Sequence, residues 1–201
     1  MRLDSSLLLG AACCATVVST SFAQNAAAAK PIPPAAQQIA AALTALPEDL
    51  RAGAAVLGYS ADGKLTSLRV AKNDMICLAP KPSDTKFHSA CYHKAMEPFM
   101  ARGRELRAQG VKDPQVDTVR FAEVKSGKLK MPTAPTMLYQ IFGGTFDPAT
   151  AKVTGGQWLY VTYIPFATAA TTGLTDKGRD NGPWIMYPGT PKAHIMFSVG
   201  M

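Results

Sequence analysis

Two cysteines constrain the fold of this chain more than any other feature of its sequence. Cys77 and Cys91 lie in residues 75–100, a stretch that also holds two of the three histidines, and no other cysteine occurs after residue 14. In an exported protein an even pair of cysteines is expected to be oxidised. We predict a Cys77–Cys91 disulfide that closes a loop of about fifteen residues and contributes about 3 kcal/mol to stability. It would tie a strand to the start of the main helix.

The expectation of export rests on residues 1–23, which have the features of a secretory signal peptide. Arg2 supplies positive charge, residues 7–18 form an apolar run too short to span a bilayer comfortably, and residues 21–23 (SFA) provide the small residues that a signal peptidase reads. We therefore expect cleavage before Gln24 and a periplasmic or secreted protein.

Two alternatives for this N-terminal segment stay open. One is an uncleaved membrane anchor. The other is a lipoprotein acylated at Cys13 or Cys14, although Gly10 occupies a position where lipoproteins usually have a large aliphatic residue.

After the signal peptide, the sequence predicts a short tether and one domain. Residues 24–34 are rich in Ala and Pro, which is typical of a flexible tether. Residues 35–201 are predicted to form a single α+β domain, because the roughly 178 residues left after cleavage suit one hydrophobic core. No later segment has the length of a transmembrane helix. The formal net charge is +7, but the basic residues are scattered, so we predict no nucleic-acid partner.

The spacing of apolar residues predicts three helices. Residues 35–46 and 96–109 repeat apolar residues at intervals of three and four, and Pro98 places the start of the second helix near Glu97. Residues 113–126 are predicted to form a third helix, ended by Gly127. A hairpin of two strands is the alternative for this third segment.

Runs of apolar and alternating residues predict the strands, at 54–59, 65–70, 75–78, 136–142, 157–166, 184–187 and 193–199. The first three are expected to form an antiparallel meander, and residues 143–156 and 167–182 are expected to be loops. We predict an α+β fold: a mostly antiparallel sheet of about six strands with two or three helices packed on one side.

Metal binding is an alternative use of residues 75–100. The residue types of a tetrahedral zinc site occur there, as Cys77, His88, Cys91 and His93. Their spacing does not match known zinc motifs, and oxidised sulfurs would not bind zinc. Copper is the second alternative, since His93 or His194 could combine with the sulfur of a methionine such as Met196. We predict no metal and no cofactor, and keep copper or zinc handling as an alternative function.

Motifs for catalysis are missing from the sequence. There is no Gly-x-Ser-x-Gly elbow and no Gly-x-Gly-x-x-Gly, and residues 173–178 have the glycine spacing of a P-loop without its Lys and Ser or Thr. We therefore favour a non-enzymatic protein and assign no catalytic residue. An envelope hydrolase with His93 or His194 as its base is the alternative.

Aromatic and polar residues of the C-terminal strands predict a ligand site. Aromatic walls with a few polar groups are typical of such sites. The residues assigned to ligand binding are His93, Tyr163, Arg179, Trp184, Tyr187 and His194. The alternative is that the aromatic residues belong to the core and edge of the sheet. The function favoured by the sequence is an exported binding module for an unknown small molecule or envelope component.

Three blocks of the sequence resemble a group of bacterial exported hypothetical proteins of unknown function. The blocks are MICLAP…ACYHKAMEPFMARGRELRAQG within residues 75–110, YIPFATAATTGL at 163–174 and PWIMYPGTPKAHIMFSV at 183–199. The resemblance covers the chain from about residue 46 to the end. It implies a recurring single-domain exported fold and carries over no activity, cofactor or site residue.

Overall fold

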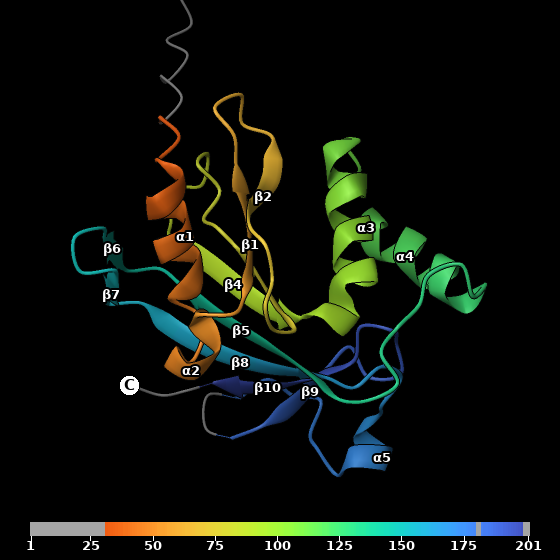
Figure 1. The fold of residues 1–201 in the computed structure, drawn as a ribbon. Coiled ribbons are helices and arrows are strands. Elements are labelled where there is room, and N and C mark those ends of the chain that lie inside the picture. The colour runs from red at the N-terminus through yellow and green to blue at the C-terminus, as the bar shows by residue number, and fades with distance from the viewer. Residues whose placement is uncertain (1–30, 180–181, 199–201) are drawn as a thin grey trace, which may run out of the picture.

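The computed structural model of this 201-residue chain describes residues 31–179 and 182–198. The predicted signal peptide (1–23) and most of the predicted tether (24–34) lie outside these residues. Within the described ranges, no helix is long and apolar enough to cross a membrane. The structure is of the α+β class, with helices around one large sheet (Figure 1), and this part of the fold prediction is confirmed.

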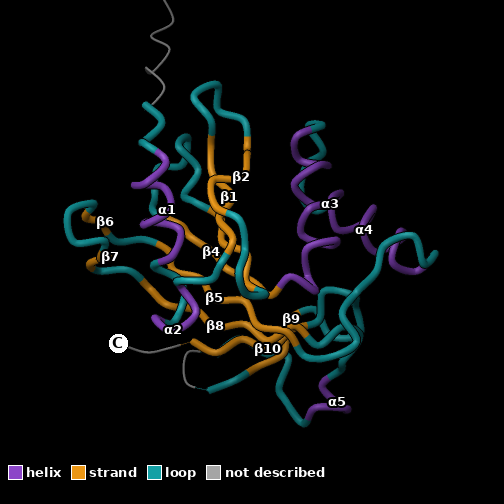
Figure 2. Tube along the Cα trace, in the orientation of Figure 1, coloured by secondary structure: helices purple, strands orange, loops and turns teal. Residues whose placement is uncertain are grey.

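In the described part of the chain, the framework is an eight-stranded sheet with the order β2-β1-β3-β4-β5-β8-β10-β9. Figure 2 shows these strands as a continuous band through the molecule. Their bounds are β1 Ala55–Tyr59, β2 Leu65–Arg69, β3 Met75–Leu78, β4 His88–His93, β5 Thr136–Phe142, β8 Gln157–Tyr163, β9 Trp184–Met186 and β10 His194–Ser198. A separate ribbon pairs β6 (Thr145–Asp147) with β7 (Lys152–Thr154). The sheet is mostly antiparallel, as predicted, but larger than the expected six strands.

The first three strands do not form the predicted antiparallel meander. β1 lies between β2 and β3, and it is antiparallel to β2 but parallel to β3. The exposure of the strands accounts for this order. The first three residues of β2 are exposed, whereas β1 buries alternate residues, including Val56. A largely exposed strand suits the edge of a sheet, which leaves the inner position to β1.

β4 and the β6–β7 ribbon are the strands that the sequence interpretation missed. The sequence indicates that residues 88–93 lead into a helix, but they form a six-residue strand between β3 and β5. Its sequence, HSACYH, contains few strong strand formers, so its conformation depends on pairing with two remote neighbours. The ribbon lies in residues 143–156, which were predicted to be a loop.

The three predicted helices are confirmed to within a few residues. They are α1 (Ala35–Leu43), α3 (Glu97–Ala108, preceded by the 3-10 turn η1 at Lys94–Met96) and α4 (Gln115–Lys125), so the hairpin alternative for residues 113–126 is wrong. Proline is accepted in the first turn of α3, where its missing N–H costs no helical hydrogen bond. The short helices α2 (Glu48–Arg51) and α5 (Ala169–Thr172) complete the described set.

The helices cover both faces of the sheet, so the prediction that they pack on one side is wrong. The Ser89 hydroxyl of β4 donates a hydrogen bond to the carbonyl oxygen of Ala42 in α1 at 2.7 Å. Tyr92 of the same strand donates from its hydroxyl to the Glu97 carboxylate of α3 at 2.5 Å. Residues 89 and 92 are an odd number of positions apart, so their side chains point to opposite faces. Figure 1 shows α1 on one side of the sheet and α3 with α4 on the other.

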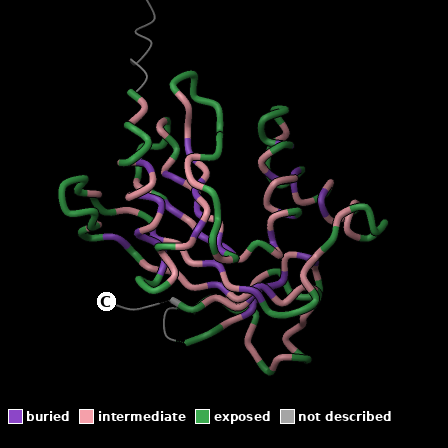
Figure 3. Tube along the Cα trace, in the orientation of Figure 1, coloured by how far each residue is buried: buried purple, intermediate pink, exposed green. Residues whose placement is uncertain are grey.

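A hydrophobic cluster forms on each face. The cluster under α1 includes Ala42, Leu46, Val56, Met75, Cys77, Cys91 and Ile141. The cluster under α3 and α4 is made of Tyr92, Met96, Phe99, Leu138, Val161 and Tyr163. Figure 3 shows that the buried residues follow the central strands, between the helices.

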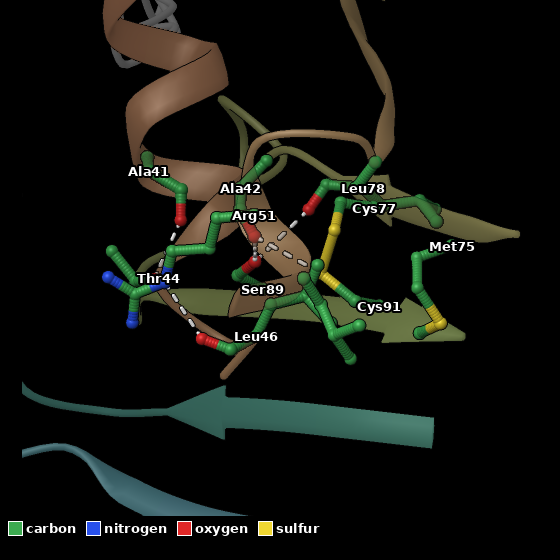
Figure 4. Close-up of a disulfide and its surroundings, with 12 residues drawn as sticks. Ala41, Ala42, Thr44, Leu46, Arg51, Met75, Cys77, Leu78, Ser89 and Cys91 are labelled. Atoms are coloured by element: carbon green, nitrogen blue, oxygen red, sulfur yellow. Dashed lines mark hydrogen bonds between the residues drawn. A yellow bond between two sulfur atoms is a disulfide. The ribbon is translucent and has the colours of Figure 1, made fainter. Parts of the chain in front are cut away.

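The predicted disulfide is present and joins two strands. Cys77 in β3 lies directly opposite Cys91 in β4, with a Cα–Cα distance of 4.0 Å and an S–S bond of 2.06 Å. Figure 4 shows the bridge between the strands, near Ala42 and Leu46. Both cysteines are fully buried in the cluster under α1. The bridge thus ties β3 to β4, and not to the start of the main helix as predicted.

Removing this disulfide should destabilise the protein. The double substitution Cys77→Ala/Cys91→Ala is expected to lower the free energy of unfolding by about 2–5 kcal/mol, the usual cost of losing a native disulfide. Urea denaturation followed by circular dichroism measures this change. A reductant should cause a comparable loss in the unsubstituted protein and none in the double variant. Equal unfolding midpoints for the double variant and the unsubstituted protein, both measured without reductant, would contradict the prediction.

Candidate functional site

Three residues predicted to bind a ligand, Tyr163, Tyr187 and His194, meet at one end of the sheet. The centroid of the His194 ring lies 5.0 Å from that of Tyr163 and 5.8 Å from that of Tyr187. Strand pairing brings them together, because His194 in β10 is directly opposite Tyr163 in β8 and Met186 in β9. Tyr187 directly follows β9. This part of the predicted site is therefore a real cluster of side chains.

His194 is held in this cluster as a neutral imidazole. It is 5% exposed, and its Nδ1 lies 2.7 Å from the carbonyl oxygen of Lys192. A carbonyl oxygen only accepts hydrogen bonds, so Nδ1 carries the proton of the neutral ring. Burial lowers the pKa of His194 and the Lys192 ammonium lowers it further, which together outweigh the opposing effect of the hydrogen bond.

An ionic network lies beside these rings and joins α4 to the β9–β10 loop. Lys192 Nζ lies 2.8 Å from Asp117 Oδ2 and 4.4 Å from the centroid of the Tyr187 ring. Asp117 also pairs with Arg120, which follows it on the same face of α4. Arg120 is 3% exposed, lies 3.8 Å above the Phe99 ring and donates from Nη1 to the Phe99 carbonyl oxygen at 3.1 Å.

The carboxylate of Asp117 is shared by the two cations of this network, Lys192 and Arg120. Burial alone would raise the pKa of Asp117, but hydrogen bonds from Lys192 and Arg120 outweigh it and the pKa lies below its ordinary value. Burial raises the pKa of Tyr163 to about 12, so its hydroxyl stays protonated at neutral pH. Arg120 Nε and Thr136 Oγ1 are buried polar atoms without a hydrogen-bond partner among the described residues. The network joins α4 to the end of the sheet and offers no free base.

Trp184 and Arg179 lie outside this cluster of rings. Trp184 is half-buried further along β9, where it is opposite Met196. Arg179 is exposed in the loop before β9, and residues 180 and 181 of that loop are outside the described residues.

His93, the remaining predicted site residue, lies on the opposite face of the sheet from His194. It shares with Cys91 the face that α1 covers, because residues two apart in a strand point the same way. Its Nδ1 accepts a hydrogen bond from the N–H of Ala95 at 3.2 Å, and its Nε2 lies 3.7 Å from Asp74 Oδ2. The two histidines therefore belong to separate sites.

His93 lines a cleft of about 680 Å³, which we call the His93 cleft. Its walls are formed by Met75, His93, Ala95, residues 131–137 and Tyr139. Residues 131–135 also form a wall of a neighbouring cleft of about 740 Å³, which extends to residues 164–167. Both volumes are in the range of small-molecule sites. Neither cleft is lined by Tyr163, Tyr187 or His194.

The geometry does not favour a hydrolase or a zinc site. Among the described residues, neither His93 nor His194 lies within hydrogen-bond distance of a Ser, Thr or carboxylate oxygen. The same residues contain no group of three or more His, Cys, Asp or Glu side chains that could hold a metal ion. The two cysteines of the alternative zinc set form the disulfide, and His88 contacts Gln140 on the other face from His93.

The sequence interpretation missed the ionic network and most of the cleft. Arg120 offered one signal, since it is four residues from both Val116 and Val124 and so falls on the apolar side of its helix. Lys192 offered none, because a lysine in a turn is usually solvated. The His93 cleft could not be predicted, because the sequence does not indicate that residues 88–93 form a strand.

Comparison of the chain with protein-family models, curated proteins and solved structures gave no match. The resemblance to bacterial exported proteins therefore stays a prediction.

Removing the carboxylate of Asp117 should destabilise the protein strongly. Asp117→Asn leaves the buried guanidinium of Arg120 without its counter-ion, which is expected to cost about 3 kcal/mol of unfolding free energy. Lys192→Met is the matched control: Asp117 keeps Arg120 as its partner, and the loss should be about 1 kcal/mol. Urea denaturation measures both. A smaller loss for Asp117→Asn than for Lys192→Met would contradict the assigned network.

His194 should make stability depend on pH in the mildly acidic range. Its pKa in the folded protein lies below the ordinary value of 6.5, so the unfolded chain takes up the proton first. The free energy of unfolding that neutral His194 contributes is then fully present above pH 6.5. It is lost as the pH falls below that value. Unfolding free energies from about pH 8 to about pH 5 measure this slope. His194→Gln should reduce the slope; an unchanged slope would show that His194 is not its source.

Proposed function

We propose that this chain is an exported, non-enzymatic binding protein that holds its ligand in the His93 cleft. The observation that carries the proposal is the position of His93, a predicted ligand-binding residue that lines a cleft of suitable volume. The cleft combines an apolar wall with few polar groups, which is typical of sites for small molecules.

The residues of the cleft support binding more than catalysis. Met75, Met137 and the segment 131–135 (MPTAP) give apolar contact area, while His93 and Tyr139 supply polar atoms. His93 is only partly exposed and its Nε2 is 3.7 Å from the nearest carboxylate oxygen, that of Asp74. A general base needs a closer partner than this to be oriented for proton transfer.

The cluster around His194 is a weaker candidate for the binding site. Its ammonium and guanidinium groups already have Asp117 as their partner, and the imidazole is buried between two aromatic rings. A ligand there would have to replace contacts that hold α4 on the sheet. We therefore assign a structural role to this cluster and the binding role to the cleft.

Export is part of the proposal and is supported by two features. The N-terminal sequence has the pattern of a signal peptide, and Cys77 and Cys91 form a disulfide, a bond that persists in oxidising compartments. The ligand would be a small molecule or a component of the cell envelope.

Small aromatic probes should bind in the His93 cleft. Titration of the ¹⁵N-labelled protein with indole or phenol is expected to shift the amide signals of Ala95 and Tyr139, because these residues line the cleft. Ala95→Trp should abolish the shifts by filling the cleft. Ala167→Trp is the matched control, since Ala167 lines only the neighbouring cleft of the two. Shifts that are absent, or that survive in Ala95→Trp, would contradict the proposal.

A further inference from the structure

Three side chains of the His93 cleft form a row across adjacent strands. Met75 in β3 is directly opposite His93 in β4. The β4–β5 register pairs Tyr92 with Leu138, so the next position along the ladder places His93 opposite Met137. Partners across a ladder point to the same face of a sheet. The imidazole of His93 is therefore flanked by one methionine on each side, and all three residues line the same cleft.

This row presents soft metal ligands at a suitable spacing. Directly opposite residues in neighbouring strands have Cβ atoms about 4.5–5.5 Å apart, so the two flexible thioethers can converge on one atom beside the imidazole. Thioether sulfur is a poor ligand for Zn²⁺ but selects Cu(I). Cys77 and Cys91 are oxidised and do not compete for the metal.

The surroundings of His93 match those of a metal-binding histidine. Nδ1 accepts a hydrogen bond from Ala95 N–H, so Nε2 carries the proton of the neutral ring and is directed toward Asp74 at 3.7 Å. Asp74 is in turn held by Lys94 at 2.8 Å. A carboxylate behind the non-coordinating nitrogen is a common support for a histidine ligand. The lone pair of Nδ1 is directed at the N–H of Ala95, and both residues line the cleft.

The hydroxyl of Thr162 in β8 donates a hydrogen bond to Met137 Sδ at 3.0 Å. Because β8 and β4 lie on opposite sides of β5, this contact holds the sulfur away from His93. The side chain of Met137 therefore has to rotate toward His93 to bind a metal there, which an unbranched thioether can do. Met75 is 6% exposed and is held in the cluster under α1.

We infer that the His93 cleft binds Cu(I) through Nδ1 of His93 and the thioether sulfurs of Met75 and Met137. The metal would replace the Ala95 N–H at Nδ1, so binding releases no proton and changes no oxidation state. This inference rests on the proposed binding function and adds a metal ion to the ligands that the same cleft can hold.

Titration with Ag(I) tests the inference, because Ag(I) shares the preference of Cu(I) for thioether sulfur and needs no reductant that would open the disulfide. In protein with ¹³C-methyl methionine, one equivalent of Ag(I) should shift the methyl signals of Met75 and Met137, and Zn²⁺ should not. His93→Ala and Met137→Leu are each expected to weaken Ag(I) binding by about tenfold or more. Met137→Leu nearly conserves side-chain volume, so the fold is retained. His88→Ala and Met100→Leu, which lie outside the cleft, should leave the affinity unchanged.

Several outcomes would overturn the inference. They are no binding of Ag(I), binding that is insensitive to Met137→Leu, or binding that is lost on replacing His194 instead of His93. Competition for Cu(I) with bicinchoninate should rank the variants as Ag(I) does, and a different ranking would also count against the site. If indole binds the cleft while Ag(I) does not, the copper inference is wrong and the binding function stands. If neither binds, both are wrong.

Discussion

The burial of β4 on both faces is the constraint on which most of this structure depends. Ser89 and Cys91 face α1, whereas Tyr92 faces α3. A slip of one residue in the pairing of this strand would exchange its two sets of side chains, so the register is strongly specified. The disulfide to Cys77 holds the same register. The position of His93 beside two methionines follows directly from it.

The helices and most strands could be predicted because their signals are local. Pro98 and Gly110 mark the start and the end of α3, and alternating or apolar runs mark most of the sheet. β4 could not be predicted, since it is stabilised by contacts with β3, β5 and α1 that no local pattern in residues 88–93 reveals. The parallel pairing of β1 with β3 has the same cause: it depends on which strand can tolerate the edge, and not on any turn.

In the candidate sites, too, features that depend on nearby residues could be predicted, and contacts between distant residues could not. The disulfide could be predicted from the signal-peptide pattern and the pair of cysteines that follows it, and the contact of His194 with Tyr163 from two strong strand signals. The network of Asp117, Arg120 and Lys192 could not, because 75 residues separate the acid from the lysine. The network joins α4 to the end of the sheet, whereas His93 lines a cleft on the other face.

The segment at residues 131–135 separates two clefts and is a wall of both. A ligand that pushes this wall outward from one cleft narrows the other. Occupation of the two clefts would then be mutually antagonistic, and by thermodynamic linkage each ligand would weaken the other by the same factor. Proline at positions 132 and 135 limits the backbone freedom of the wall, so any such movement would involve the segment as a unit.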